Sequence, residues 1–293
     1  MSFSYNIKLK LAEVNSDCEF CKLAELYGMI SMTAIRKNGR LSIITENEHV
    51  FRKIKRLFAD CIGFVPPEHD YAGGYRLEIS EDIELDLLSE KLHFGEPLDM
   101  YSDEIIPFEC CGISYLRGAF LGGGSVSDPK KNYHLEFDAK TRNDAENLKK
   151  VIAEHGIAAK LTERKNHFIV YVKGYEDIAA VMGIIGAGTA AMEIYNVSIE
   201  KEIRNDINRR MNCESANIDK VARAYVKHMH AIEKIDKAIG IEALPESLAE
   251  IAKIRMEYPD ESLKALGERL TPPIGKSGVN HRLNRILEIA EKL

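Results

Sequence analysis

The sequence predicts an α+β protein: two successive αββαββα repeats related by a pseudo-two-fold axis, followed by an all-α unit. The same order of helices and strands occurs twice with an offset of about 93 residues, as expected for two half-domains in one chain. Residues 115–126 open the second repeat, and Gly118 and Gly122 share one helix face there, so a second helix can approach the backbone closely. From about Met192 the pattern is helical to the end of the chain.

The first repeat follows from local turn signals and apolar spacing. Asn38-Gly39 between alternating residues is a strong signal for a two-residue hairpin, and residues 48–61 carry apolar side chains at helical spacing. The predicted elements are, in order, a helix at 20–31, strands at 33–36 and 40–45, a helix at 48–61, strands near 62–66 and 75–79, and a helix at 82–92.

The second repeat has the same order of elements. Asp128-Pro129 marks a turn, and Ala145, Leu148 and Ile152 lie on one side of a helix. The predicted elements are a helix at 114–123, strands at 124–126 and 133–137, a helix at 142–155, strands at 158–162 and 167–172, and a helix at 174–185.

The remaining part is predicted to be helical throughout. Gly240 is typical of a helix stop, Asp260 can cap the helix after it, and Pro272 and Pro273 forbid a continuous helix. The predicted helices are 190–212, 215–240, 246–257, 260–270 and 277–293. The expected division is a first repeat with an N-terminal extension at 1–110, a second repeat at 111–205, and a linker helix with a C-terminal helical domain at 206–293.

Composition places the chain among soluble globular proteins. Its apolar content of 45% and charged content of 29% are typical of that class. No apolar run approaches the ~20 residues that span a bilayer. The N-terminus also lacks the basic start and apolar core of a secretion signal. We therefore expect a cytoplasmic protein without membrane contact.

Six cysteines are spread along the chain, at positions 18, 21, 61, 110, 111 and 213. Cys18 and Cys21 have the spacing of a metal knuckle, but no second C-x-x-C or H-x3-H follows to complete a tetrahedral site. Buried free thiols, with no bound metal, are the expectation.

Charge is segregated along the chain despite the net charge of −6. Residues 78–109 hold eleven acidic residues and one lysine, whereas residues 264–287 hold five Lys or Arg and a single acid, Glu268. Contact with phosphates requires a local cationic surface, whatever the net charge. An ordinary solvated helix face is the alternative.

The last predicted helix has an apolar and a polar side. The apolar side is formed by Val279, Leu283, Ile286, Leu287 and Ala290. A short helix, a turn and a helix with polar residues at its start match helix-turn-helix geometry; a small helical oligomerisation domain is the alternative. The candidate base-reading residues are Asn280, His281, Asn284 and Arg285, and the candidate phosphate-holding residues are Lys276, Ser277 and Arg282.

Three groups of residues resemble the WhiA family of bacterial regulators. They are 116–126 with Asp128-Pro129 and 133–137, 212–217 at the interdomain junction, and 277–283. The resemblance covers essentially the whole chain. It implies an N-terminal domain like a LAGLIDADG homing endonuclease and a C-terminal domain like the fourth region of bacterial sigma factors. It also implies binding of double-stranded DNA on the nucleoid, with roles in sporulation gene control or in cell division and chromosome segregation.

In LAGLIDADG enzymes each of two paired helices delivers one acid to divalent metals. By this resemblance the matching positions are Ile30 and Gly123, which cannot ligate Mg²⁺ because that ion takes oxygen ligands. A slip of one residue gives no acid either, and the nearest acids, Glu25 and Asp128, lie off these positions. Without a metal there is no activated water, so we expect no catalytic residues, no metal, no cofactor and no enzyme activity.

The two sheets of such a domain form a saddle that lies on duplex DNA. The candidate contacts on this surface are Arg36, Lys37, Arg40, Lys130, Lys131, Arg164 and Lys165. The acidic segment 78–109 could weaken the surface, so a face used for protein, or for the chain's own C-terminal domain, stays open. The preferred function is a non-catalytic DNA-binding regulator of transcription. The alternatives are a module that contacts transcription or cell-division proteins, and a Mg²⁺-dependent endonuclease.

Overall fold

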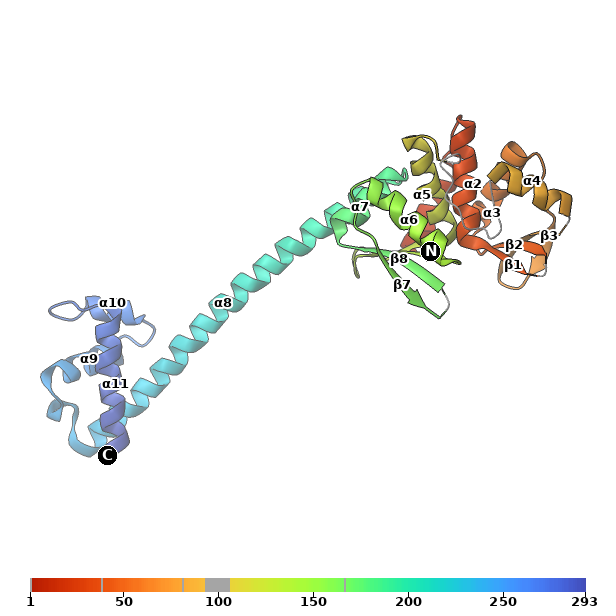
Figure 1. Ribbon diagram of the computed structural model, residues 1–293. Coiled ribbons are helices and arrows are strands. Elements are labelled where there is room, and N and C mark those ends of the chain that lie inside the picture. Colours follow the sequence, from red (N-terminus) through yellow and green to blue (C-terminus); the bar gives the residue numbers. More distant parts are fainter. Residues whose placement is uncertain (1, 38, 81, 93–105, 166) are drawn as a thin grey trace. The chain divides into compact units, whose positions relative to one another are not determined.

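The computed structural model describes residues 2–37, 39–80, 82–92, 106–165 and 167–293 (Figure 1). Contacts divide the chain into two compact units, Met1–Lys201 and Glu202–Leu293. The first unit mixes helices with two antiparallel sheets, and the second is helical. The predicted α+β class is therefore confirmed. No helix among the described residues is both long and apolar enough to cross a bilayer.

The first unit consists of an N-terminal helix, α1 (Phe3–Ala12), and two repeats of one topology. The first repeat holds α2 (Glu19–Thr33), β1 (Ala34–Lys37), β2 (Arg40–Thr45), α3 (Glu48–Leu57), β3 (Glu68–Tyr71), β4 (Gly74–Ile79) and α4 (Asp82–Leu92). The second holds α5 (Glu109–Gly123), β5 (Gly124–Val126), β6 (His134–Ala139), α6 (Arg142–Glu154), β7 (Lys160–Arg164), β8 (His167–Lys173) and α7 (Tyr175–Ile184). The strand orders, β1-β2-β4-β3 and β5-β6-β8-β7, are the same in both repeats.

Helices α2 and α5 form the centre of this unit, and each is 15 residues long. A Cβ at Gly118 would lie 2.0 Å from the carbonyl oxygen of Glu25, and one at Gly28 would lie 2.3 Å from that of Tyr115. These contacts are reciprocal, as a pseudo-two-fold axis requires, and any side chain at either glycine would force the helices apart. The predicted backbone-to-backbone approach at Gly118 is confirmed.

Both sheets lie on one side of the helices (Figure 1). Along β6 the burial alternates, so that Leu135, Phe137 and Ala139 face the core while the residues between them face outward. In the first sheet Leu41, Ile43 and Leu77 face the core in the same way. The opposite side of each sheet is therefore available for contact with another molecule.

Two points of the predicted first unit need correction. Helix α1 was not predicted. Residues 62–66 form no strand, because a π-helical turn, Phe58–Ile62, extends α3 and Gly63 then adopts a φ of 95°. The strand lies later, at β3, whose residues are all exposed and so give no apolar alternation. The predicted hairpin is confirmed: β1 pairs antiparallel with β2 and Gly39 has a φ of 76°, while Asn38 lies outside the described residues.

Helix α8 (Gly188–Ile239) is continuous, whereas the sequence predicted two helices that end and begin near Cys213. No proline or internal glycine interrupts this segment, and its polar residues at 212–217 do not break a helix. In the second unit a 3₁₀ turn, Ile241–Ala243, leads to α9 (Glu246–Glu257), α10 (Leu263–Glu268) and α11 (Lys276–Lys292). The cap of α10 is Ser262, whose hydroxyl accepts from the Ala265 backbone, and not Asp260 as predicted.

Candidate nucleic-acid interface

Helix α11 turns one side into the core of the second unit and leaves the other exposed. Val279, Leu283 and Ile286 are fully buried, and they pack in one cluster with Leu248, Ile251 and Leu266 of the preceding helices. Six predicted site residues lie on exposed positions, and we call them the α11 face: Lys276, Ser277, Asn280, His281, Asn284 and Arg285. Residues 276–287 contain no acid, so this face is cationic over its first three turns.

The seventh predicted residue, Arg282, is in a different position. It is half-buried, donates to the carbonyl oxygen of Ser247 at 3.2 Å and pairs with Glu250 at 3.5 Å. Its charge is thus partly compensated by α9, and it fixes α11 against that helix. Arg285 also has an acidic neighbour, Glu288 at 2.6 Å, but both side chains are exposed and such pairs exchange readily.

The turn between α10 and α11 is held tightly. A Cβ at Gly267 would lie 2.1 Å from the carbonyl oxygen of Ile274, whose backbone N–H in turn bonds to Gly267. Arg269 donates to Glu261 at 2.8 Å and lies 3.7 Å from the ring centre of Tyr258. The short helix α10, the fixed turn and the exposed polar side of α11 together have the arrangement of a helix-turn-helix, which presents its second helix to the major groove.

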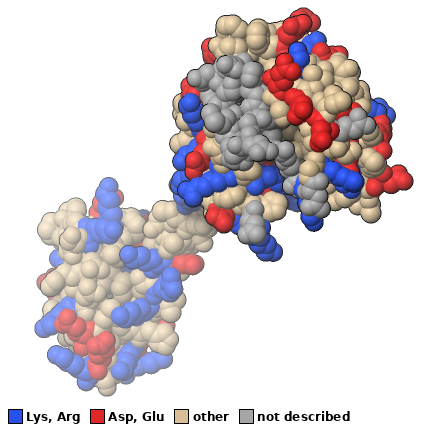
Figure 2. All heavy atoms as spheres, turned by 45° about the vertical axis from the view of Figure 1, so that its right-hand side comes forward, with Lys and Arg blue, Asp and Glu red and all other residues tan. Residues whose placement is uncertain are grey.

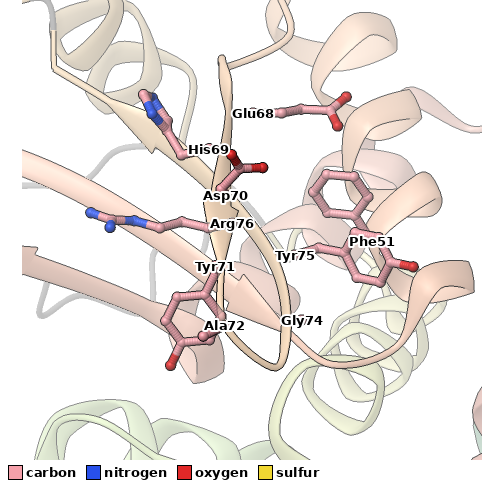
Figure 3. Close-up of a pocket in the computed structure, with 9 residues that line it drawn as sticks. All are labelled: Phe51, Glu68, His69, Asp70, Tyr71, Ala72, Gly74, Tyr75 and Arg76. Atoms are coloured by element: carbon pink, nitrogen blue, oxygen red, sulfur yellow. The ribbon is translucent and has the colours of Figure 1, made fainter.

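The outward side of the first sheet carries both predicted and unpredicted cations. Strand pairing places Lys37, Arg40 and Arg76 on this side, since Lys37 pairs with Arg40 and Ile44 with Arg76. Figure 3 shows the same alternation around the β3–β4 hairpin: His69, Tyr71 and Arg76 point to one side, and Phe51, Glu68 and Tyr75 to the other. For Arg36 only the backbone is described, opposite Leu41 in β1.

One buried carboxylate lies among these cations. Glu78 is 6% exposed, accepts from Arg40 at 3.1 Å, and also pairs with Arg76. It therefore neutralises part of the positive potential of the first sheet.

The outward side of the second sheet likewise carries cations together with a carboxylate. Register places Lys160, Arg164 and Lys173 on its outward side with His167 and Asp138. Asp138 accepts from Lys140 at 3.2 Å and contacts the Nδ1 atom of His167 at 2.7 Å. The other predicted lysines lie in turns rather than on strands: Lys165 between β7 and β8 with a φ of 50°, and Lys130 and Lys131 between β5 and β6.

In the first unit, Lys and Arg gather along the lower edge of Figure 2, the side on which Figure 1 places the sheets. Sequence reasoning missed Arg76, Lys160 and Lys173 on this side. Arg76 lies in the predicted strand 75–79 and Lys160 in the predicted strand 158–162, and Lys173 directly follows the predicted strand 167–172. The sheet register was needed to show that the three share the outward sides.

The position of the expected acids lies where α2 and α5 end. The structure pairs Gly123 with Thr33 rather than with Ile30, because these two residues end helices of equal length; Ile30 is fully buried one turn earlier. A Cβ at Gly123 would lie 2.6 Å from the Asp138 carbonyl oxygen. Neither Thr33 nor Gly123 offers a carboxylate. The residues at the helix ends do not fit a Mg²⁺ centre, which takes carboxylate ligands.

A lysine lies at the place where a metal would be expected. The Lys8 ammonium donates to the carbonyl oxygen of Leu121 at 3.0 Å, near the end of α5. Lys8 also lines a pocket together with Thr33, Gly123 and Asp138. Burial lowers the pKa of Lys8 to about 8, while Glu46 opposes this shift. An ammonium here complements the negative end of the helix, and it disfavours a second cation.

The two acids nearest to these positions in the sequence have structural roles. Glu25 is 1% exposed and pairs with Lys53 at 2.7 Å and with Arg117 at 3.7 Å. Burial raises the pKa of Glu25, and both basic neighbours oppose this. Asp128 accepts from the backbone N–H of Lys130 at 2.9 Å and so closes the β5–β6 turn.

Each of the two units matches a known family model. The family model for the WhiA LAGLIDADG-like domain matches residues 113–204, and that for the WhiA C-terminal HTH domain matches residues 207–290.

Similar proteins cover the whole chain. The probable cell division protein WhiA of Desulfitobacterium hafniense is 40% identical over 309 residues, covering 100% of this chain and 96% of that relative. The protein of the same name from Alkaliphilus oremlandii is 39% identical, covering 100% and 98%. Among solved structures, full-length WhiA from Thermotoga maritima matches with a TM-score of 0.60 at 25% identity, covering 100% of this chain and 99% of that one.

Proposed function

This chain belongs to the WhiA family, and from that premise we propose that it is a non-catalytic, nucleoid-associated DNA-binding protein. We assign it a role in transcription regulation, acting in cell division and chromosome segregation or in sporulation. The names of the relatives, probable cell division proteins, support the division role. The helix-turn-helix supplies most of the affinity in this proposal.

The single observation that carries the proposal is the α11 face. Asn280 and Asn284 are exposed one turn apart, and an amide can pair with adenine through two hydrogen bonds in the major groove. Lys276 and Ser277 lie at the start of the helix, where side chains and backbone N–H groups can hold a phosphate. The packing of Val279 and Leu283 into the core fixes which side of α11 meets the DNA.

Genome-wide crosslinking of the full chain to DNA in the organism that encodes it tests this proposal. We expect discrete enriched sites for the parent protein, and their loss in an Asn280→Ala, Asn284→Ala double variant. Lys292→Ala, on the last turn of the same helix, is the matched control and should keep the sites. Enrichment that is unchanged in the double variant would exclude α11 as the reading helix.

The proposal also excludes strand cleavage. We expect no nicking of supercoiled DNA, including plasmids that carry the enriched sites, at any Mg²⁺ or Mn²⁺ concentration. Metal-dependent nicking by the purified parent protein would contradict it.

A protein-binding role for the sheets is the second candidate function, and one observation favours it. Ile35 and Tyr71 are 46% and 43% exposed on the outward side of the first sheet, beside arginines already paired with Glu78. Apolar groups next to compensated charges suit a protein surface better than a phosphate backbone. A partner from the transcription or division machinery that is retained after nuclease digestion, and lost in Ile35→Asp, would support this role.

A further inference from the structure

Three thiols meet where the two central helices begin. Cys21 is the third residue of α2, and Cys110 and Cys111 are the second and third of α5. Their sulfur atoms all lie within 4.8 Å of one another, and the Sγ atoms of Cys21 and Cys111 are 3.9 Å apart. Cys21 and Cys111 are buried, and Cys110 is exposed.

These sulfur distances fit a shared cation better than a covalent bond. A disulfide requires about 2.05 Å between its sulfurs. In a tetrahedral site with Zn–S bonds of about 2.3 Å, two thiolates lie ~3.8 Å apart. The 3.9 Å between Cys21 and Cys111 agrees with the second value, and the Cys110 sulfur lies within 4.8 Å of both.

The backbone holds the thiols in place. The reciprocal contacts of Gly28 and Gly118 hold α2 closely against α5. Burial, and then the neighbouring Cys21, raise the pKa of Cys111, so its thiol keeps the proton until a cation displaces it. Phe20, in the first turn of α2, and Phe108, at the N-cap of α5, contact each other edge-to-face with ring centres 6.0 Å apart, which adds a contact between the beginnings of the two helices.

We propose that Cys21, Cys110 and Cys111 form a binding site for one thiophilic cation, with Zn²⁺ as its occupant. Three thiolates supply sulfur ligands and release their protons to water on binding, and a water molecule takes the fourth position on the solvent side beside Cys110. The site joins the first repeat to the second at the ends of α2 and α5 opposite Lys8. The sequence offered only Cys18 and Cys21, and the fold supplies the missing pair from the next repeat.

Metal binding by the purified full chain tests this inference. We expect one Zn²⁺ per chain by elemental analysis, and Co²⁺ in its place should give the intense visible bands of a tetrahedral site with sulfur-to-metal charge transfer. Cys110→Ser changes an exposed side chain and should preserve the fold. It should weaken Zn²⁺ affinity more than about 100-fold, beyond the effect of losing an outer-shell partner. Circular dichroism of the metal-free proteins confirms that parent and variant are equally folded.

Cys213→Ser is the matched control, because Cys213 is exposed on α8 and outside the cluster. It should keep full stoichiometry and the Co²⁺ spectrum. Three outcomes would overturn the proposal: no stoichiometric Zn²⁺ in the parent, equal affinity in Cys110→Ser and the parent, or a Cys21–Cys111 disulfide detected by mass spectrometry in protein purified with Zn²⁺.

Discussion

The α11 face and the outward sides of the two sheets carry similar cations in different surroundings. On α11, residues 276–287 include no acid, and among the described residues the face has one close acidic partner, the exposed Glu288. On the sheets, carboxylates lie among the cations: Glu78 pairs with Arg40 and Arg76, and Asp138 with His167. Uncompensated charge drives phosphate binding, so we expect DNA affinity to be concentrated in the second unit.

The largest effect should come from the base-reading positions of α11. Asn280→Ala should weaken binding to an enriched site by ~1–3 kcal/mol and relax specificity at one base pair. Fluorescence anisotropy with matched and mismatched duplexes measures both quantities. Arg40→Ala on the first sheet serves as the comparison and should leave specificity unchanged. Equal loss of specificity in both variants would break the contrast between the two surfaces.

The second unit should also lose stability in acid, because His228 is buried at 5% exposure near Arg255. Burial, and then the Arg255 charge, lower the pKa of His228 to about 4. The unfolded state therefore binds the proton first, so this stability is present above pH ~6.5 and is lost as the pH falls toward 4, by at most ~1.4 kcal/mol per unit. Urea titrations of the full chain from pH 7 to 4.5 measure it. His228→Gln should flatten the dependence, and an unchanged slope would refute this cause.

A smaller effect is expected in the salt dependence of binding. Lys276→Ala should lower the slope of log affinity against log salt by about one, uniformly across sequences, because one phosphate contact is lost. Arg40→Ala should lower it by clearly less, since Glu78 already compensates that charge. Anisotropy titrations at several salt concentrations compare the two. A larger change for Arg40→Ala would mean that the sheet contacts the backbone more closely than α11 does.

The smallest expected effect tests whether the first sheet contacts DNA. Glu78→Gln keeps the shape of the side chain but releases Arg40 and Arg76 from their charge partner. If the first sheet contacts DNA, affinity at low salt should rise by a few-fold and the gain should vanish at high salt. Affinity that is unchanged at low salt would place the duplex away from this sheet.

The sequence predicted much of this fold because most helices have clear spacing and stop signals. The predicted ranges 82–92 and 246–257 coincide with α4 and α9. β3 was placed too early, because an exposed edge strand carries no apolar alternation. The α11 face could be found from helical periodicity alone. The pairing of Glu78 with Arg40 could not, since it depends on the β2–β4 register, and the thiol cluster depends on the packing of α2 against α5.

Lys8 gives the centre of the first unit a cation that is part of the polypeptide. A bound ion exchanges with the medium and can be removed by a chelator, whereas this ammonium is part of the chain and keeps its charge below its pKa of about 8. The positive charge at this end of the two central helices therefore does not depend on a supply of divalent ions.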